Sequence, residues 1–345
     1  MKLLTLMVLA ALLFPGCRNE ERQTGAGPSI VVFIPGVMAG SAVYQMLAEG
    51  ALKAVEEFNR GINAGGSDGE ATITVIEGGF NQAAWENQIT TLAASGEFDL
   101  IISSNPSMPD LLVPVLQRFP SQKFLLLDAE MAGNPNVFSL RYNQREQGFM
   151  AGYIAALVSL ELSGPGGGAR RLGLIAGQEY PMMNNVILPG FIEGAQAVDP
   201  DFTVDFRVVG NWFDAARAAE LAAAMIRGGV NVLLPIAGGA GHGVVQAAEE
   251  AGAKIVWFNT NGYAIRPGTI VGSSILRQDL AAYQTVTAFL NGTLPFGQAE
   301  VAGAVDGFVD FVEDDPYFIA AVSPEIRARQ AILTARIRSG ELRLD

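Results

Sequence analysis

The segment GGFNQAAWENQITTLAASGEFDLII, residues 78–102, can be laid without a gap on GNWFDAARAAELAAAMIRGGVNVLL, residues 210–234. In each segment an aromatic residue, Phe80 or Trp212, precedes a helical pattern that leads through a glycine turn into an apolar strand. The identity is slight, so either the chain contains a duplicated domain or two ordinary β-α-β units look alike. In both cases the segments indicate two α/β halves.

Short β-rich runs alternate with amphipathic helical patterns over most of the chain. Strands that are apolar along their whole length and bounded by helices are typical of parallel sheets covered on both faces. We therefore expect an α/β fold of doubly wound parallel sheets, with ligands bound at the carboxyl ends of the strands. The expected strands are residues 30–34, 71–76, 99–103, 124–127, 137–140, 172–176, 204–209, 230–236 and 254–258, and the expected helices include residues 42–58, 81–94, 108–119, 215–227 and 243–251.

The first residues have the pattern of an export signal. A cationic start is followed by an apolar run over residues 3–14, which is shorter than the roughly 20 residues that cross a bilayer as a helix. Cys17 is the only cysteine, so it cannot form an internal disulfide. The stretch LFPGC, residues 13–17, resembles a bacterial lipobox, in which the cysteine is acylated. We predict a signal peptide over residues 1–16 and lipidation of Cys17; the alternative is an ordinary cleaved signal with a chance cysteine.

Residues 17–28 are polar and contain glycine, and they are expected to form a tether that holds an exported protein on a membrane through the lipid. Loss of residues 1–16 removes Lys2, which leaves 22 − 1 = 21 basic residues against 35 acidic ones, a net charge of −14. Such a charge argues against a nucleic-acid partner. We expect a monomer.

Catalytic motifs of the common kinds do not occur in the sequence. It has no G-x-x-x-x-G-K-[ST], G-x-S-x-G or H-E-x-x-H. Because His242 is the only histidine, a His-based triad or a His/Cys metal cluster is hard to assemble. We expect no catalytic residue, metal or cofactor. The alternative is an enzyme or ligand sensor on the same fold, with Asp128 or Glu179 in acid/base work.

A glycine-rich turn joins an apolar strand to a helix in VLLPIAGGAGHGVVQAAEEAG, residues 232–252. Gly238 and Gly239 allow a tight turn, and they leave backbone N–H groups free for a polar ligand group at the helix start. The alternative is a plain compact turn. A dinucleotide fingerprint, G-x-G-x-x-G, cannot be read here.

Several of these segments together resemble one family. They include EQGFMAGYIAA at residues 146–156, the segment from Trp212, AGGAGHGV at residues 237–244 and SSILRQDLAAY at residues 273–283. The chain is similar, over roughly residues 30–312, to the basic membrane protein family of substrate-binding lipoproteins, which includes spirochaetal purine nucleoside receptors. The resemblance implies a receptor that feeds an ABC permease and has no chemistry of its own.

The resemblance also implies a type I periplasmic-binding-protein fold, in which two doubly wound parallel-sheet domains are joined by a three-segment hinge. We expect the chain to cross between the domains three times. The expected parts are an N-terminal lobe of residues 29–142 plus 265–306, a C-terminal lobe of residues 143–264 plus 307–345, and hinge crossings near residues 140–144, 261–269 and 304–311.

This chain departs from the family at two loops. The family commonly has a D-D-x-S-F-N-like loop after the first strand, whereas this chain has Ala39-Gly40 for the acidic pair and Val43-Tyr44 for Phe-Asn. Where the family commonly has V-D-S-D, with an Asp on ribose hydroxyls, this chain reads Phe258-Asn259-Thr260-Asn261. An Asn offers one acceptor and two donors, while a carboxylate only accepts. A vicinal diol would therefore bind less tightly.

The predicted binding residues lie in loops at strand ends, between the two halves. The expected ligand is a small polar molecule, with a purine nucleoside as the first candidate, and Tyr44 is the expected stacking residue. Arg277 takes the position of a family Lys. The candidate ligand-binding residues are Tyr44, Asn105, Asp128, Gln178, Glu179, Tyr180, Trp212, Gly238, Gly239, Asn259, Asn261 and Arg277.

Overall fold

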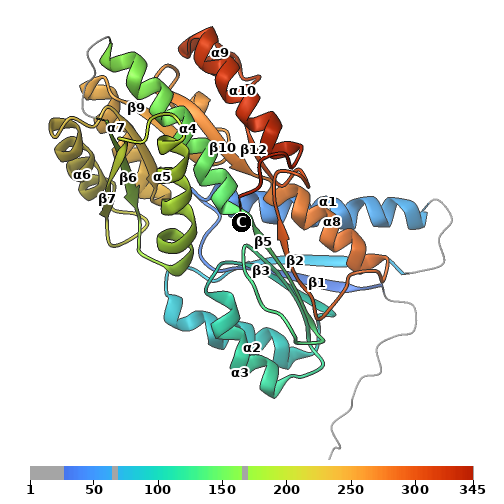
Figure 1. The fold of residues 1–345 in the computed structure, drawn as a ribbon. Helices are drawn as coiled ribbons and strands as arrows, with labels where there is room; N and C mark the ends of the chain where they lie inside the picture. Colours follow the sequence, from blue (N-terminus) through green and yellow to red (C-terminus); the bar gives the residue numbers. More distant parts are fainter. Residues whose placement is uncertain (1–26, 64–68, 165–169, 345) are drawn as a thin grey trace, which may run out of the picture.

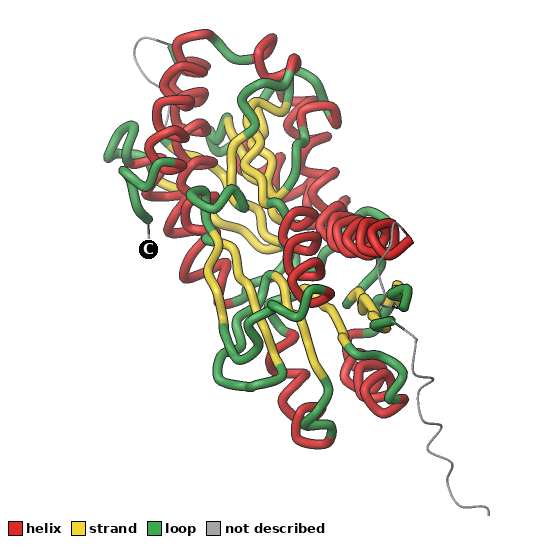
Figure 2. The backbone as a smooth tube through the Cα atoms, turned by 90° about the vertical axis from the view of Figure 1, so that its right-hand side faces the viewer, coloured by secondary structure: helices red, strands yellow, loops and turns green. Residues whose placement is uncertain are grey.

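The computed structural model describes residues 27–63, 69–164 and 170–344. The predicted signal peptide, Cys17 and all of the tether before Gly27 lie outside the described residues. Within these ranges the strands form two six-stranded sheets. Figure 2 shows them as two separate groups of strands, each flanked by helices. The expected fold class, two α/β domains with parallel sheets, is confirmed.

The first sheet is parallel throughout, and five of its six strands had been expected from the sequence. Its order is β11 (Ala299–Ala302), β5 (Val137–Tyr142), β4 (Lys123–Leu127), β3 (Leu100–Ser104), β1 (Ser29–Ile34) and β2 (Thr72–Glu77).

The second sheet repeats this order and differs at one edge, where β12 is antiparallel to β10. Its order is β12 (Val309–Phe311), β10 (Ile270–Leu276), β9 (Lys254–Asn259), β8 (Val232–Ile236), β6 (Arg171–Ala176) and β7 (Thr203–Val208). Strands β3 and β8 occupy the same place in the two sheets, and they also coincide in the alignment of residues 78–102 with 210–234.

Helices cover both faces of each sheet, and we call a sheet with its helices a lobe (Figure 1). In the first lobe α1 (Ala42–Asn63) and α8 (Gln278–Leu290) pack together on one face, and α2 (Trp85–Ser95) and α3 (Met108–Arg118) lie on the other. In the second lobe the corresponding pairs are α4 (Gln144–Ser163) with α5 (Leu188–Gln196), and α6 (Ala215–Arg227) with α7 (Gly241–Ala251). Helices α9 (Pro316–Ala321) and α10 (Pro324–Arg338) complete the second lobe against β10, β12 and α4.

Strand β1 shows why the sequence folds in this way. Its side chains alternate between two apolar layers, because successive residues of a strand point to opposite faces of the sheet. Ile30, Val32 and Ile34 pack in the cluster that contains α1, whereas Val31 and Phe33 pack with α2 and α3. All five are completely buried, which requires the continuous apolar run that the sequence has.

The chain crosses between the lobes at three places. The first crossing follows β5 and ends at the start of α4, and the third lies between β11 and β12. The second crossing lies between Leu276 and Gln278, because β10 pairs with β9 and β12 in the second sheet. The expected crossing at residues 261–269, and with it the placement of residues 265–276 in the first lobe, was therefore wrong. The strand IVGSSIL contains a glycine and two serines, so its sequence gave no strand signal.

Helices α4 and α5 approach each other closely through glycines. A Cβ atom at Gly152 would lie 2.0 Å from the carbonyl oxygen of Phe191, and one at Gly194 would lie 2.0 Å from that of Phe149. Gly148 and Gly190 are in similarly close contact with the opposite backbone. The glycines of EQGFMAGYIAA therefore serve helix packing, and this explains the four-residue spacing in each helix.

We predict that Gly152→Ala destabilises the protein by about 2 kcal/mol or more, because the added methyl group forces the two backbones apart. Gly61→Ala is the matched control: it makes the same change in a helix where a Cβ meets nothing within 4 Å. That variant should be neutral or more stable by about 0.5–1 kcal/mol, since alanine favours helix. Urea unfolding of both variants measures the difference, and equal stabilities would contradict this account of the packing.

Candidate functional site

In the first lobe, three predicted residues follow the carboxyl ends of β1, β3 and β4. The Tyr44 hydroxyl donates to the carbonyl oxygen of Pro35 at 3.0 Å and accepts from Asn105 Nδ2 at 3.2 Å. Asn105 Oδ1 accepts from the backbone N–H and the hydroxyl of Ser107. The hydrogen bond between Tyr44 and Asn105 thus orients both side chains, and the partly buried Tyr44 ring lies beside Gly36.

Asp128 is the third of these residues, and its environment is unusual. It directly follows β4 with a φ of 51°, in the left-handed region that Asp and Asn tolerate better than other side chains. Among the described residues no hydrogen bond or ion pair to its carboxylate is found, and it is mostly shielded from solvent. Burial raises the pKa of Asp128 from 3.8 to about 7. At neutral pH the carboxyl group is therefore close to half ionised.

Three tyrosine hydroxyls are close enough to be affected by this carboxylate. Burial raises the pKa of Tyr44 to about 12, and the Asp128 charge adds to the effect. Burial, together with the Asp128 charge, also raises the pKa values of Tyr142, at the end of β5, and Tyr180, which follows β6. Because Tyr180 belongs to the second lobe, Asp128 lies on the side of the first lobe that faces the second.

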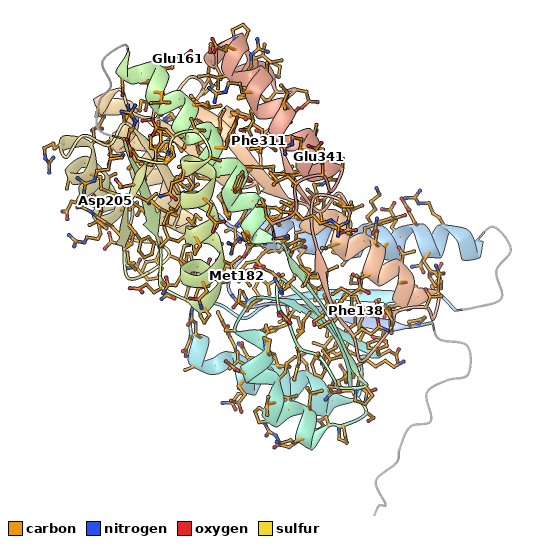
Figure 3. The ribbon with its side chains drawn as sticks, in the orientation of Figure 1. Phe138, Glu161, Met182, Asp205, Phe311 and Glu341 are labelled. Atoms are coloured by element: carbon orange, nitrogen blue, oxygen red, sulfur yellow. The ribbon has the colours of Figure 1, made fainter. Side chains whose placement is uncertain are left out.

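In the second lobe, aromatic side chains gather after β6 and β7. The rings of Tyr180 and Trp212 are 6.1 Å apart, and Trp212 Nε1 donates to Gln178 Oε1 at 3.2 Å. The Trp212 ring lies against Gly177, where a Cβ would come within 2.4 Å of it. Figure 3 shows Met182, from the same loop, at the end of this lobe that lies beside the first.

The glycine-rich turn after β8 packs on the same tryptophan. The backbone N–H of Ala240 donates to the Trp212 carbonyl at 3.1 Å. Gly238 and Gly239 are exposed, and Gly238 has a φ of 55°, which a residue with a side chain rarely adopts. The structure thus brings Gln178, Tyr180, Trp212 and this turn together.

Asn259 is the last residue of β9, and the strand register gives it the same place in the second sheet as Asp128 has in the first. Its φ is 73°, and in the described chain only Asp128 and Asn259 combine a side chain with a positive φ. Asn259 Oδ1 accepts from Gln147 Nε2 at 3.0 Å. The two lobes therefore each place one short polar side chain, in a strained backbone conformation, at the carboxyl end of the fourth strand of the pseudo-repeat.

Three predicted residues are engaged elsewhere. Asn261 is exposed, donates to Asp315 Oδ2 at 2.8 Å and accepts from the backbone N–H of Tyr263. Arg277 forms two hydrogen bonds of 3.0 Å with Asp279. Glu179 is exposed and accepts from Asn184. The structure assigns all three to local loop and helix contacts and does not group them with Asp128.

Buried residues at the crossings were not predicted from the sequence. The Tyr142 hydroxyl donates to Gln278 Oε1 at 2.6 Å, and Gln278 Nε2 donates to Ser104 Oγ at 2.5 Å. Gln147 lies in the first turn of α4 and is completely buried. The place of Gln147 in EQGFMAGYIAA, a segment shared with the family, was the available signal for it.

Two open hollows of about 710 and 730 Å³ lie elsewhere on the surface. One is between α6 and α7, the other beside the amino-terminal ends of β1, β3 and β4, and neither contains a predicted site residue. Over the described ranges, no group of three or more His, Cys, Asp or Glu side chains could hold a metal ion. None of the helices described is long and apolar enough to cross a membrane. The candidate site is therefore defined by polar groups and aromatic rings at strand ends.

We predict that Asp128 makes the ligand-free protein less stable as pH rises. The pKa of Asp128 is about 7 in the folded state and ordinarily 3.8. Between these pH values the folded protein therefore binds more protons than the unfolded protein does. The contribution is fully present below pH 4 and is lost as pH rises through 7. Between pH 5 and pH 8 the loss should be about 2–3 kcal/mol.

Urea unfolding of wild type and Asp128→Asn at both pH values isolates this contribution, because the variant has no titrating group at that position. The variant should lose less stability than wild type over the same interval. Equal losses in the two proteins would show that Asp128 has an ordinary pKa.

The fold and the site together define a class of protein. It has two α/β lobes joined by a three-segment hinge, and the strand ends of the two lobes, which carry polar and aromatic groups, face each other. A family profile described as ABC transporter substrate-binding protein PnrA-like matches residues 28–343. The chain therefore belongs to this family of ABC transporter substrate-binding proteins, as the sequence resemblance predicted.

Curated relatives are similar to the chain at low identity. A Lactococcus lactis protein named "ABC transporter nucleoside-binding protein BmpA" is 27% identical over 152 residues, which is 44% of this chain and 41% of the relative. Basic membrane protein C of Borreliella burgdorferi is 24% identical over 329 residues, or 90% and 87% of the two chains. The alignments with Listeria relatives named CD4+ T-cell-stimulating antigen cover 46% of those proteins, so this chain spans less than half of their length.

Solved structures show the same fold. A solute-binding protein of an ABC transporter system from Aeropyrum pernix K1 has a TM-score of 0.79 at 22% identity, over 92% of this chain and 93% of that one. A transcriptional activator of the comK gene from Bacillus halodurans has a TM-score of 0.69 at 21% identity, over 91% and 99%. Proteins named for quite different roles therefore share the architecture, so the ligand has to be inferred from the site and not from the fold.

Proposed function

We propose that the protein is the membrane-anchored receptor of an ABC importer and that it binds a small polar ligand, with a purine nucleoside as the first candidate, between its lobes. Binding closes the lobes around the three crossings, and the closed form docks on a permease. The lipid on Cys17 holds the receptor at the membrane after export. Family membership supports the transport role; the ligand and the anchor are our proposals.

The observation that carries this proposal is the Asp128 carboxyl group. It is partly buried, and no hydrogen-bonding partner is found for it among the described residues. A buried carboxylate in that condition is costly, and a ligand that donates hydrogen bonds to it would remove the cost. A small molecule with N–H or O–H groups is such a ligand.

Aromatic rings in both lobes support a ligand with a flat face. Tyr44 lies in the first lobe, and the Tyr180–Trp212 pair lies in the second. Stacking on such rings is a general means of holding a purine base. The name of the Lactococcus relative, a nucleoside-binding protein, agrees with this choice.

The environment of Asp128 favours binding over catalysis. Acid/base chemistry at Asp128 would need a second titrating group or a nucleophile near it. Its neighbours Tyr44, Tyr142 and Tyr180 all have raised pKa values, so their hydroxyls stay protonated at neutral pH. They cannot act as bases, and the hydroxyl protons of Tyr44 and Tyr142 are already donated to the Pro35 carbonyl and to Gln278 Oε1.

We predict that Asp128→Asn weakens binding of adenosine, guanosine or inosine by about 10- to 100-fold, because a charge-assisted hydrogen bond is lost. Calorimetry on the detergent-solubilised full chain at pH 8, where Asp128 is ionised, measures the affinity. Asp201→Asn is the matched control: Asp201 is exposed and lies before β7, at the opposite end of the strands.

The control should bind as wild type does. If all three nucleosides fail to bind wild type, the nucleoside assignment is wrong. If they bind and Asp128→Asn has no effect, the site is wrong. Free base released in proportion to protein over a long incubation would favour an enzyme.

We predict that Cys17 carries acyl chains, because it follows an export signal and precedes a polar tether. In a bacterial host fed a clickable palmitate analogue, wild type should be labelled and Cys17→Ser should not. Ser41→Ala, a substitution in the globular part, is the processing control and should be labelled as wild type is. Equal labelling of Cys17→Ser and wild type would contradict lipidation.

A further inference from the structure

The side chain of Gln147 connects α4 to the ends of β9 and β10. Gln147 Nε2 donates to Asn259 Oδ1 at 3.0 Å and to the backbone carbonyl of Ser274 at 3.1 Å. The Ser274 hydroxyl donates back to the Gln147 carbonyl at 2.8 Å. Gln147 and Ser274 are both completely buried, so water cannot replace these partners.

The polarity of this arrangement follows from the Ser274 carbonyl, which can only accept. The Gln147 amide atom that faces this carbonyl must therefore be the NH2 group. The same NH2 group faces Asn259, so the Asn259 atom opposite it must be the oxygen. A reversed Gln147 would point one oxygen at another, which is unfavourable in a buried site. The orientation of both amides is thus set by a backbone atom.

Asn259 consequently has its single acceptor occupied and its two donors available. Within the described ranges no acceptor is found for Asn259 Nδ2. The residue is partly exposed at the carboxyl end of β9, where the φ of 73° turns it out of the strand. The other amide atom of Gln147, Oε1, is buried and has no hydrogen-bonding partner in the part of the chain that the structure describes. The two N–H donors of the partly exposed Asn259 therefore remain available to a bound molecule.

We propose that Gln147 is a positioning residue that makes Asn259 present its NH2 group to the ligand, so that the ligand group held there is a hydrogen-bond acceptor such as a carbonyl, ring nitrogen, ether or phosphate oxygen. This inference rests on the proposed function and narrows its ligand class. The family resemblance implies a carboxylate in this loop that accepts hydrogen bonds from ribose hydroxyls. In this chain the side chain at the same place donates hydrogen bonds instead. A hydroxyl can accept from Asn259, but its own proton then needs another acceptor.

The first experiment restores an acceptor by Asn259→Asp, in which one carboxylate oxygen stays opposite Gln147 and the other faces the ligand. Calorimetry compares adenosine with 2′,3′-dideoxyadenosine, and adenosine with inosine. If the sugar faces this residue, the variant should favour the ribose form by about tenfold more than wild type does. If the base faces it, the variant should shift preference by a similar factor from the 6-oxo to the 6-amino purine.

Asn134→Asp is the matched control, because Asn134 makes only a local bond to the backbone of Asn136 in the first lobe. It should leave both ratios unchanged. If Asn259→Asp binds these nucleosides and shifts neither ratio by more than about threefold, well under the effect of one hydrogen bond, the proposal is overturned.

The second experiment needs no ligand and so separates this inference from the nucleoside assignment. In the full chain labelled with ¹⁵N-glutamine and ¹⁵N-asparagine, the Gln147 side-chain NH2 protons should exchange slowly with solvent and those of Asn259 quickly. Gln147→Leu removes the first signal and should leave the Asn259 protons in fast exchange. Protected Asn259 protons in the ligand-free wild type would overturn the proposal, whether or not nucleosides bind.

Discussion

The buried hydrogen-bond chain from Tyr142 through Gln278 to Ser104 is the constraint on which the two-lobed arrangement depends. Burial keeps Tyr142 protonated, so its hydroxyl donates to Gln278, and Gln278 in turn donates to Ser104. These three residues lie at the end of β5, the start of α8 and the end of β3. The hydrogen bonds therefore fix the first-lobe ends of two of the three crossings. A hinge motion can change the backbone only beyond these hydrogen-bonded residues.

The second lobe also has a buried, hydrogen-bonded glutamine just after the chain crosses into it. Helix α4 follows the first crossing and carries Gln147 in its first turn, as α8 follows the second crossing and begins with Gln278. Each glutamine bonds to groups in the lobe that its helix enters. Buried amides of this kind cost free energy unless satisfied, so they specify one arrangement of strand and helix. The close glycine contact of α4 with α5 then fixes the helix that carries Gln147.

The sequence predicted most strands and helices well, and it predicted strand pairing and side-chain contacts less well. Apolar runs identified β1 to β9. The pattern is strongest in inner strands such as β1 and β8, which are buried on both faces, and weaker in the partly exposed edge strands β2 and β7. Strand β10 was missed, and the second crossing with it, because sheet membership depends on long-range pairing. Strand-end position correctly grouped Tyr180 with Trp212, yet it could not show that Asn261 pairs with Asp315. Gln147 could not be identified either, because its role depends on a carbonyl 127 residues away.

Asp128 and Asn259 explain why two similar lobes would hold a ligand in one orientation. They occupy equivalent places, at the ends of β4 and β9, with the same left-handed backbone. A pair of identical residues there would allow a ligand to bind in either direction. In the proposed site the ionised Asp128 would accept and Asn259 would donate, so the site would favour a molecule whose own donors and acceptors are arranged in the opposite sense. The pseudo-symmetry of the sheets thus supplies matched positions, and in the proposed site the difference between the two side chains would set the orientation of the ligand.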